Sequence, residues 1–250
     1  MNEHESKHMT VKDIQLRVPD SYRPRGSREK NRSDISESFG EYLEGIWRLM
    51  QENASVSTGE LAQYMGVQPA SVTTMLKRLA EQGYVEHIPY QGVRLSLSGN
   101  AEACSLLRKH RLVECLLVDY LELPWDDVHD MACRLEHFLS DEVADKMEVA
   151  LGYPSSCPHG NPIKPETADN YIRLSEAITG DRLIVKRITD ERKEFLTYLK
   201  GIGLIPETSI EVTERNPFGN ILMLNIQGTN WPVAIASDSA KAIRVRQADI

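Results

Sequence analysis

The stretch STGELAQYMGVQPASVTTMLKRLAEQGYVEHIPYQGVRLSL, residues 57–97, decides the fold expected for the first part of the chain. Ser57 and Glu60 have the spacing of a capping box, in which each side chain bonds the other's backbone amide. A helix is therefore expected to begin here and to end at Gly66. A second helix is expected to open at Gln68-Pro69, because proline is tolerated in a first turn. Its apolar face consists of Val72, Met75, Leu76 and Leu79.

Two strands are expected after this helix, over residues 84–88 and 93–97, around the turn Pro89-Tyr90-Gln91-Gly92. Two short helices and a hairpin predict a winged helix-turn-helix, although a small helical domain with a β-ribbon would show the same pattern. The outer face of the second helix favours DNA binding, because small side chains fit the major groove and cations reach phosphates. The residues expected to face DNA are Gln68, Ser71 and Thr74 at the bases, and Lys77, Arg78, Gln91 and Arg94 at the backbone.

The segment before this stretch divides into an arm and a helix. Residues 1–32 have little apolar periodicity and end in five closely spaced cations, which predicts a disordered basic arm. A solubilising tail is favoured over an arm that lies along DNA phosphates. From Asp34 onward a helix is expected, because one apolar stripe follows: Phe39, Tyr42, Leu43, Ile46, Leu49 and Met50.

Helices and then strands are expected beyond the winged helix. One helix is predicted from about Gly99 to Leu121, capped by Ser98, and another from about Asp127 to Met147. The Gly- and Pro-rich segment 152–166 predicts a loop. Five short strands, with a helix over 191–200, indicate a small SH3-like β-barrel: 183–188, 209–213, 221–226, 233–236 and 243–245. The expected organisation is an α+β multidomain chain: a disordered arm (1–32), a winged helix (33–97), a helical metal-binding and dimerisation domain (98–166) and an SH3-like domain (174–250).

Composition limits the class of protein. The chain has 250 residues, of which 41% are hydrophobic and 26% charged, and this balance is typical of a soluble protein. It contains no apolar run long enough for a membrane span and no signal-peptide core, so a cytoplasmic location is expected. The four cysteines Cys104, Cys115, Cys133 and Cys157 form no CxxC pair, which suits a reducing compartment.

The net charge of −8 argues against a protein that coats nucleic acid. Residues 97–163 contain 12 acidic and 5 basic residues, so much of the negative charge lies there. Such a segment is ordinarily just solvated, and the alternative is that it holds a cation.

Metal-ligand residue types gather in and near this acidic segment. At 100° per residue, four of them fall within an arc of about 100° on one helix face: His129, Cys133, Glu136 and His137. His110 and Glu114 form an i, i+4 pair on the preceding helix, and Glu41 and Glu44 an i, i+3 pair on the first. A single such pair is usually a surface contact and a lone cysteine is usually core. The convergence of imidazole, thiolate and carboxylate favours a divalent first-row metal.

Three runs in this region closely resemble the diphtheria toxin repressor family of iron- and manganese-dependent transcriptional regulators. They are HRLVE at 110–114, HDMACRLEH at 129–137 and GNPI at 160–163. The resemblance covers roughly residues 33–250. It implies a winged helix, a helical dimerisation domain, a C-terminal SH3-like domain, and a homodimer that binds double-stranded operator DNA.

The resemblance also implies two metal sites. One would use His110, Glu114 and His129, with Glu191 and Glu194 from the third domain. The other would use Cys133, Glu136 and His137, joined by Glu41. Manganese-type members carry a carboxylate at the Glu41 position, where iron-type members have methionine. Cys133 instead matches the iron type, and a loop Cys-x-His in some three-domain manganese regulators matches Cys157 and His159, used together with Glu114. The expected metal is manganese in preference to iron, with iron still able to bind.

This ligand set indicates a switch rather than an enzyme. A cation that gathers carboxylates from the first helix and the helical domain would select one placement of the DNA-binding head. A catalytic metal would need an open coordination position and a general base, and the chain has no HExxH motif. The remaining alternatives are a metalloenzyme or metal-storage module with an incidental helix-turn-helix, and a winged-helix regulator that responds to thiol oxidation through Cys133 and Cys157. No membrane partner and no organic cofactor are expected.

Overall fold

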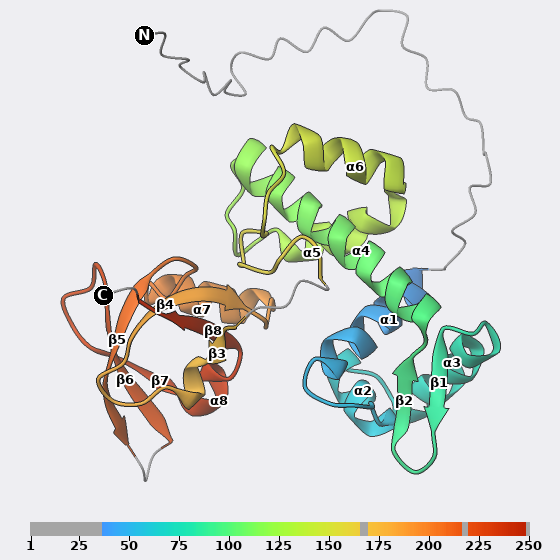
Figure 1. Cartoon of the computed structure of the whole chain (residues 1–250), viewed down its shortest axis with the longest axis horizontal. Helices are drawn as coiled ribbons and strands as arrows, with labels where there is room; N and C mark the ends of the chain where they lie inside the picture. Colours follow the sequence, from blue (N-terminus) through green and yellow to red (C-terminus); the bar gives the residue numbers. More distant parts are fainter. Residues whose placement is uncertain (1–36, 166–169, 217–219, 249–250) are drawn as a thin grey trace, which may run out of the picture.

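The computed structural model describes residues 37–165, 170–216 and 220–248, which form three parts (Figure 1). A winged helix is followed by a helical middle part, and a β-sheet part ends the chain. The long helix α4 runs from the winged helix into the middle part. Within these residues, each helix is too short or too polar to cross a membrane. The arm predicted for residues 1–32 lies outside the described residues.

The winged helix forms as the sequence predicts. Its elements are α1 (Glu37–Met50), α2 (Thr58–Met65), α3 (Pro69–Glu81), β1 (Val85–Ile88) and β2 (Gly92–Leu95). The capping box is present: the Glu60 amide donates to Ser57 Oγ at 3.2 Å, and the Ser57 amide donates to Glu60 Oε2 at 2.8 Å. Gly66 ends α2 with a φ of +65°, which favours glycine. The core is built on Leu43, Ile46, Leu61, Val72 and Leu79, all fully buried.

The junction between the wing and the next helix differs from the prediction. β2 ends at Leu95 rather than at residue 97, and α4 (Leu97–Cys115) already begins at Leu97. Ser96, not Ser98, caps this helix, because its Oγ accepts the Gly99 amide at 3.0 Å. Ser96 has the extended backbone that a cap needs, whereas Ser98 is already inside the helix.

The single helix predicted from Asp127 to Met147 is wrong. Leu139 is extended, and Ser140 Oγ accepts the Val143 amide at 3.3 Å, so a new helix is capped there. The segment instead forms α5 (His129–Leu135), a 3-10 turn (Glu136–Phe138) and α6 (Asp141–Ala150). The preceding α4 continues into a π-helical turn, Leu116–Tyr120.

The third part is a six-stranded antiparallel sheet in the order β3-β8-β4-β5-β6-β7, which agrees with the predicted SH3-like fold. Its strands are β3 (Ile172–Arg173), β4 (Arg182–Ile188), β5 (Ser209–Asn216), β6 (Ile221–Ile226), β7 (Val233–Ala236) and β8 (Ile243–Gln247). The register shifts after Val185 and after Val212, and such irregularities help a sheet to curve. Two helices complete it, α7 (Lys193–Gly201) and α8 (Ser237–Ala240). Because α7 begins at Lys193, Glu191 lies before the helix rather than in it.

Hydrogen bonds and an ion pair connect the third part to both of the other parts. Asp126, in the loop before α5, accepts hydrogen bonds from Thr197 at 3.1 Å and from Lys200 at 2.5 Å, both on α7. Arg48, near the end of α1, lies 2.8 Å from Glu191. These contacts place Glu191 between the winged helix and the helical middle part.

Candidate metal centre

Seven of the predicted ligand residues meet where the three parts join. They come from α4, from α5, from the loop after α6, and from the segment before α7. Three groups have ligand atoms within 4.8 Å of one another. We call them the thiol cluster (His110, His129, Cys133), the helix cluster (His110, Glu114, His129, Glu191) and the loop cluster (Glu114, Cys157, His159, Glu191).

Glu114 is the centre of the helix and loop clusters. It is fully buried, and its Oε1 lies 3.0 Å from His110 Nε2, 3.0 Å from His159 Nδ1 and 3.7 Å from His129 Nδ1. The i, i+4 spacing on α4 places His110 beside Glu114, while tertiary packing supplies the other two imidazoles. One carboxylate therefore faces three imidazoles.

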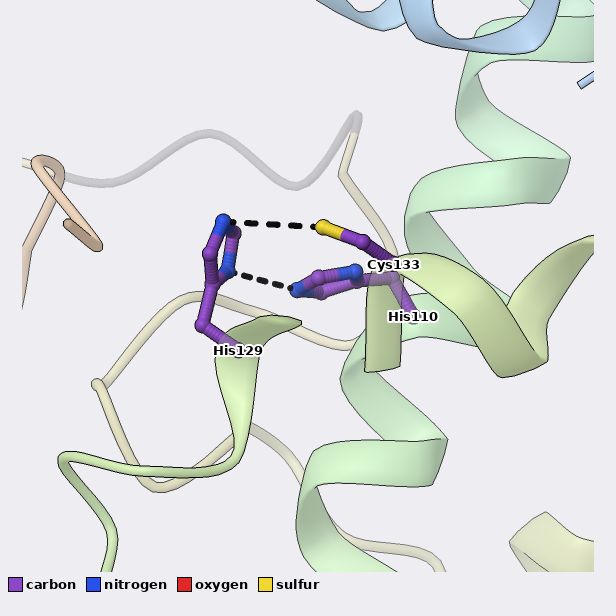
Figure 2. Close-up of side chains that lie close together, drawn as sticks. All are labelled: His110, His129 and Cys133. Carbon is purple, nitrogen blue, oxygen red and sulfur yellow. Dashed lines mark hydrogen bonds between the residues drawn. The ribbon is translucent and has the colours of Figure 1, made fainter. Parts of the chain in front are cut away.

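The thiol cluster is shown in Figure 2. His129 Nδ1 lies 3.2 Å from His110 Nε2, and His129 Nε2 lies 3.6 Å from Cys133 Sγ. The second nitrogen of His110, Nδ1, lies 2.6 Å from Glu136 Oε2. Cys133 thus lies with the imidazoles His110 and His129, whereas the resemblance implied that it would lie with Glu136 and His137.

The loop cluster is entirely buried and its members are held by further contacts. The Nε2 atom of His159 lies 2.7 Å from the Trp125 carbonyl oxygen, which can only accept a hydrogen bond. Nε2 therefore carries the proton, and Nδ1 faces Glu114 as a ligand atom. Asn161 Nδ2 donates to Glu191 Oε1 at 2.6 Å. Arg48, Trp125 and Asn161 thus position ligand residues, a role that sequence reasoning missed.

The residues of α1 and of the turn after α5 lie next to these clusters. Glu44 is buried, whereas Glu41 is exposed, and both line a cavity of about 770 Å³ together with Cys133 and Glu136. His137 packs against α1, since a Cβ on Gly40 would lie 2.7 Å from its Cε1. Glu194 is exposed on α7 and belongs to none of the three clusters. Glu41, Glu44, Glu136 and His137 are likewise in none of them, so the described residues do not bring the implied second site, Cys133 with Glu136, His137 and Glu41, together as one group of ligand atoms.

The donor set fits a divalent cation. Among the described residues, six buried carboxylate or imidazole atoms have no hydrogen-bond partner: Glu44 Oε1, Glu114 Oε2, Asp127 Oδ1, His137 Nε2, His159 Nδ1 and Glu191 Oε2. Two of them, Asp127 Oδ1 and Glu191 Oε2, form ion pairs with Lys193 and Arg48. Buried polar atoms are rarely left unpaired, and a first-row cation accepts imidazole, carboxylate and thiolate ligands together. These residues therefore fit a divalent first-row cation, the class of metal that the sequence predicts.

Protons and one arginine provide positive charge in these clusters. Burial lowers the pKa of His110 and of His159, but the charge of Glu114 together with hydrogen bonds to Glu114 and to a cysteine (Cys133 for His110, Cys157 for His159) outweighs it, and both pKa values lie well above the ordinary range. Burial raises the pKa of Glu191, but the charges of Arg48, His129 and His159 together outweigh it and the value is about 2. For Glu44, burial and the neighbouring Glu136 raise the pKa well above its usual range. The buried carboxylates of these clusters therefore need positive charge beside them.

Comparison with known proteins agrees with this geometry. Family models described as the N-terminal DNA binding domain and the metal binding and dimerisation domain of iron dependent repressors match residues 34–93 and 97–165, and the FeoA domain model matches residues 172–247. The diphtheria toxin repressor of Corynebacterium efficiens is 27% identical over 230 residues, which cover 86% of this chain and 98% of that protein. A solved manganese-dependent transcriptional repressor in complex with manganese is 33% identical with a TM-score of 0.76, over 84% of this chain and 100% of that chain. The chain belongs to the diphtheria toxin repressor family.

Both iron and manganese regulators are among these family members. The iron-dependent repressor IdeR of Mycobacterium leprae is 28% identical over 231 residues, which cover 86% of this chain and 99% of that protein. The structure of T. acidophilum IdeR is 28% identical with a TM-score of 0.71, over 87% of this chain and 100% of that chain. The family is therefore one of metal-dependent transcriptional repressors, and the comparisons leave manganese and iron both represented.

The winged helix of this family member exposes the residues expected to face DNA, away from the metal centre. The exposed residues are Gln68, Ser71, Thr74, Lys77 and Arg78 around α3, and Gln91 and Arg94 in the wing. Thr73, directly before Thr74, is exposed as well, and its hydroxyl donates to the Pro69 carbonyl oxygen at 3.0 Å. Arg94 lies 2.7 Å from Glu86, and the Arg78 guanidinium lies 4.7 Å from the centre of the Phe39 ring. Lys77 has neither kind of neighbour among the contacts of the described residues, so it is the α3 cation best placed for a phosphate.

The protonation of His129 predicts opposite effects of pH on the metal-free fold and on metal binding. Burial lowers its pKa, but hydrogen bonds with Cys133 and Glu114 and the charge of Glu191 outweigh this and raise the pKa from 6.5 to about 9. Protonated His129 therefore stabilises the metal-free fold. This stabilisation is complete below pH 6.5 and is lost as the pH rises through 9. Over the same interval metal affinity should rise, because the proton must leave before the nitrogen can bind.

Thermal unfolding of metal-free protein and metal titrations at pH 6.5 and 9 would measure both trends. The variant His129→Gln should show a flatter dependence in each. If the native metal-free protein instead became more stable between pH 6.5 and 9, and His129→Gln did not, the raised pKa of His129 would be contradicted.

Proposed function

We propose that this chain is a homodimeric repressor, acting in the cytoplasm, that needs a divalent metal to bind operator DNA specifically, with manganese preferred over iron. One observation carries the proposal. Glu44 of α1 lies buried against Glu136 from the helical middle part, with His110 directly beside Glu136. The helix that supports the DNA-binding head thus contributes to the same acidic centre as the dimerisation segment.

A divalent cation bound at this centre would supply the positive charge that lets the carboxylates of α1 and of the middle part lie together. Glu41, Glu44, Glu136 and His137 are the residues proposed to hold it, with Cys133 beside them. Packing within the winged helix then transmits the position of α1 to α3. Leu43 and Ile46 of α1 share one core with Leu79 of α3, so fixing α1 fixes the helix that reads DNA.

Two copies are needed for an operator with two half-sites. The matched metal binding and dimerisation segment exposes Leu135, Phe138 and Val143, large apolar side chains that a second copy can cover. Two heads would then read half-sites about 34–36 Å apart, one turn of DNA, or a multiple of this. We infer that the chain is not an enzyme, and the repressor identity of its relatives supports this.

Metal preference is expected to depend on Glu41. Oxygen donors from Glu41, Glu44 and Glu136 suit Mn²⁺, whereas a thioether in place of Glu41 would suit softer metals. In anaerobic titrations of operator binding at buffered free metal, the native chain should respond to Mn²⁺ more strongly than to Fe²⁺. Glu41→Met should shift the preference toward Fe²⁺, and Glu37→Met, an exposed change at the start of the same helix, should not. An unchanged preference in Glu41→Met would refute the manganese assignment.

Lys77 is expected to contact the DNA backbone. Lys77→Ala should weaken binding to all sequences by a similar factor, and should reduce the slope of log affinity against log salt by about one. Lys146→Ala, on exposed α6, is the matched control. Fluorescence anisotropy over a series of salt concentrations measures the slope. If Lys77→Ala changed base preference and left the slope intact, α3 would be docked differently.

A further inference from the structure

The wing, the hairpin of β1 and β2, turns through a tyrosine in a backbone conformation that tyrosine rarely adopts. The turn runs from Ile88 to Gln91, and the Gln91 amide donates to the Ile88 carbonyl oxygen at 3.1 Å. Tyr90, the third residue of this turn, has a φ of +64°. Pro89 in second place and a positive φ in third place are typical of a type II turn, whose third residue is ordinarily glycine or asparagine. A tyrosine there strains the turn.

The side chain of Tyr90 does not compensate for this strain by packing. Tyr90 is 108% exposed, the highest value among the large apolar residues that the structure describes. A ring in that position buries no apolar surface, so it adds nothing to the stability of the wing. Figure 1 shows the turn between β1 and β2 projecting from the winged helix, on the side away from the middle part. A strained residue that the fold does not need points to a function at that position.

The wing is attached firmly to the rest of its domain. Val56, in the segment before α2, is joined to Val93 of β2 by two backbone hydrogen bonds of 2.8 and 2.9 Å. Gly92 packs so closely that a Cβ there would lie 2.1 Å from the Val56 carbonyl oxygen. Both valines belong to the core that contains Leu79 of α3. The turn that carries Tyr90 therefore has a fixed position relative to the helix expected to read DNA.

The location and the chemistry of Tyr90 both fit DNA as its partner. The matched DNA binding domain covers residues 34–93 and so includes this turn. Tyrosine hydroxyls are among the groups that bond phosphate oxygens of DNA, and such contacts fix the position of a protein on the duplex. We propose that the Tyr90 hydroxyl donates a hydrogen bond to a phosphate oxygen of bound DNA. This rests on the proposed function in one respect, that the winged helix is the part of the chain that binds DNA.

Fluorescence anisotropy with the full-length, Mn²⁺-loaded protein tests the contact. Tyr90→Phe keeps the ring and the backbone but removes the hydroxyl, so affinity should fall about tenfold, the size of a hydrogen bond to a charged group. The loss should be equal on an operator duplex and on a scrambled duplex, because phosphates carry no sequence information. The slope of log affinity against log salt should stay unchanged, because tyrosine brings no cation, whereas Lys77→Ala should reduce it. Native affinity in Tyr90→Phe would overturn the proposal.

Tyr90→Asn distinguishes a DNA contact from a structural role. Asparagine tolerates a positive φ, so this variant should unfold at a higher urea concentration although its DNA affinity falls. Tyr153→Asn is the matched control, because Tyr153 is exposed with a φ of +58° in the middle part. It should gain stability and bind DNA as the native chain does. A lower urea midpoint for Tyr90→Asn, or an equal loss of DNA affinity in Tyr153→Asn, would overturn the proposal.

The two duplexes keep this test separate from that of metal activation. If the native chain bound operator equally in Mn²⁺ and in chelator, the metal-dependent repressor would be refuted, and the effect of Tyr90→Phe would still be measured on either duplex at low salt. If the native chain responded to Mn²⁺ as proposed and Tyr90→Phe bound both duplexes with native affinity, only the Tyr90 contact would be refuted.

Discussion

Glu136→Gln is expected to lower metal-activated operator binding by about 100-fold, the upper end of the range for residues that support a metal site. Glu136 is 2% exposed, its Oε2 lies 2.6 Å from His110 Nδ1, and it adjoins Glu44 of α1. The amide keeps the size of the side chain but removes the charge by which a cation would join α1 to the middle part.

The control for this variant is Glu142→Gln, an exposed change on α6. Operator affinity at saturating Mn²⁺, measured by anisotropy, should be unchanged in this control. Both proteins should keep their helical circular dichroism without metal. Full metal activation in Glu136→Gln would show that this carboxylate does not couple metal to DNA binding.

Gly99→Ala is expected to destabilise the winged helix by about 3 kcal/mol or more, the size associated with overpacking that the backbone must absorb. A Cβ at this position would lie 1.9 Å from the carbonyl oxygen of Tyr84, the residue directly before β1, where the start of α4 packs closely on the backbone. Backbone atoms cannot rotate away as a side chain can, so α4 and the wing would have to separate.

Gly59→Ala, in the same domain, is expected to have the opposite effect on stability. Gly59 lies in α2, and a Cβ there would meet nothing within 4 Å. Alanine should therefore stabilise by about 0.5–1 kcal/mol, through its helix propensity. Urea unfolding of the two variants, followed by circular dichroism, measures the difference. Equal midpoints for the two proteins would contradict the close approach of Gly99 to Tyr84.

Local signals explain the features of the fold that the sequence predicts correctly. The Ser57–Glu60 capping box and the apolar stripe of α1 depend on neighbours within one or two turns, so their residue spacing is sufficient. The break at Leu139 was missed because apolar residues continue at helical spacing through Met131, Leu135 and Leu139. The signal that could have revealed it is Ser140, a capping residue followed by two acids.

In the metal centre, too, local spacing predicts some neighbours and not others. Spacing along α4 and α5 predicts that His110 lies by Glu114 and that His129 shares a face with Cys133. Which of these faces meet is decided by tertiary packing, which brings His129 to His110. The docking of the third part likewise brings buried Glu191 to the centre and leaves Glu194, three residues later, exposed. Periodicity cannot distinguish these two glutamates.

The most direct test of metal-dependent repression is the affinity of the full-length chain for one duplex under two conditions. The duplex is the one selected from a random pool by Mn²⁺-loaded protein, and a scrambled duplex is the control. With Mn²⁺, anisotropy should show specific binding at least about 100-fold tighter than in chelator, with two chains per duplex, while binding to the scrambled duplex stays weak. Equal and sequence-specific affinity in chelator and in Mn²⁺ would contradict the account.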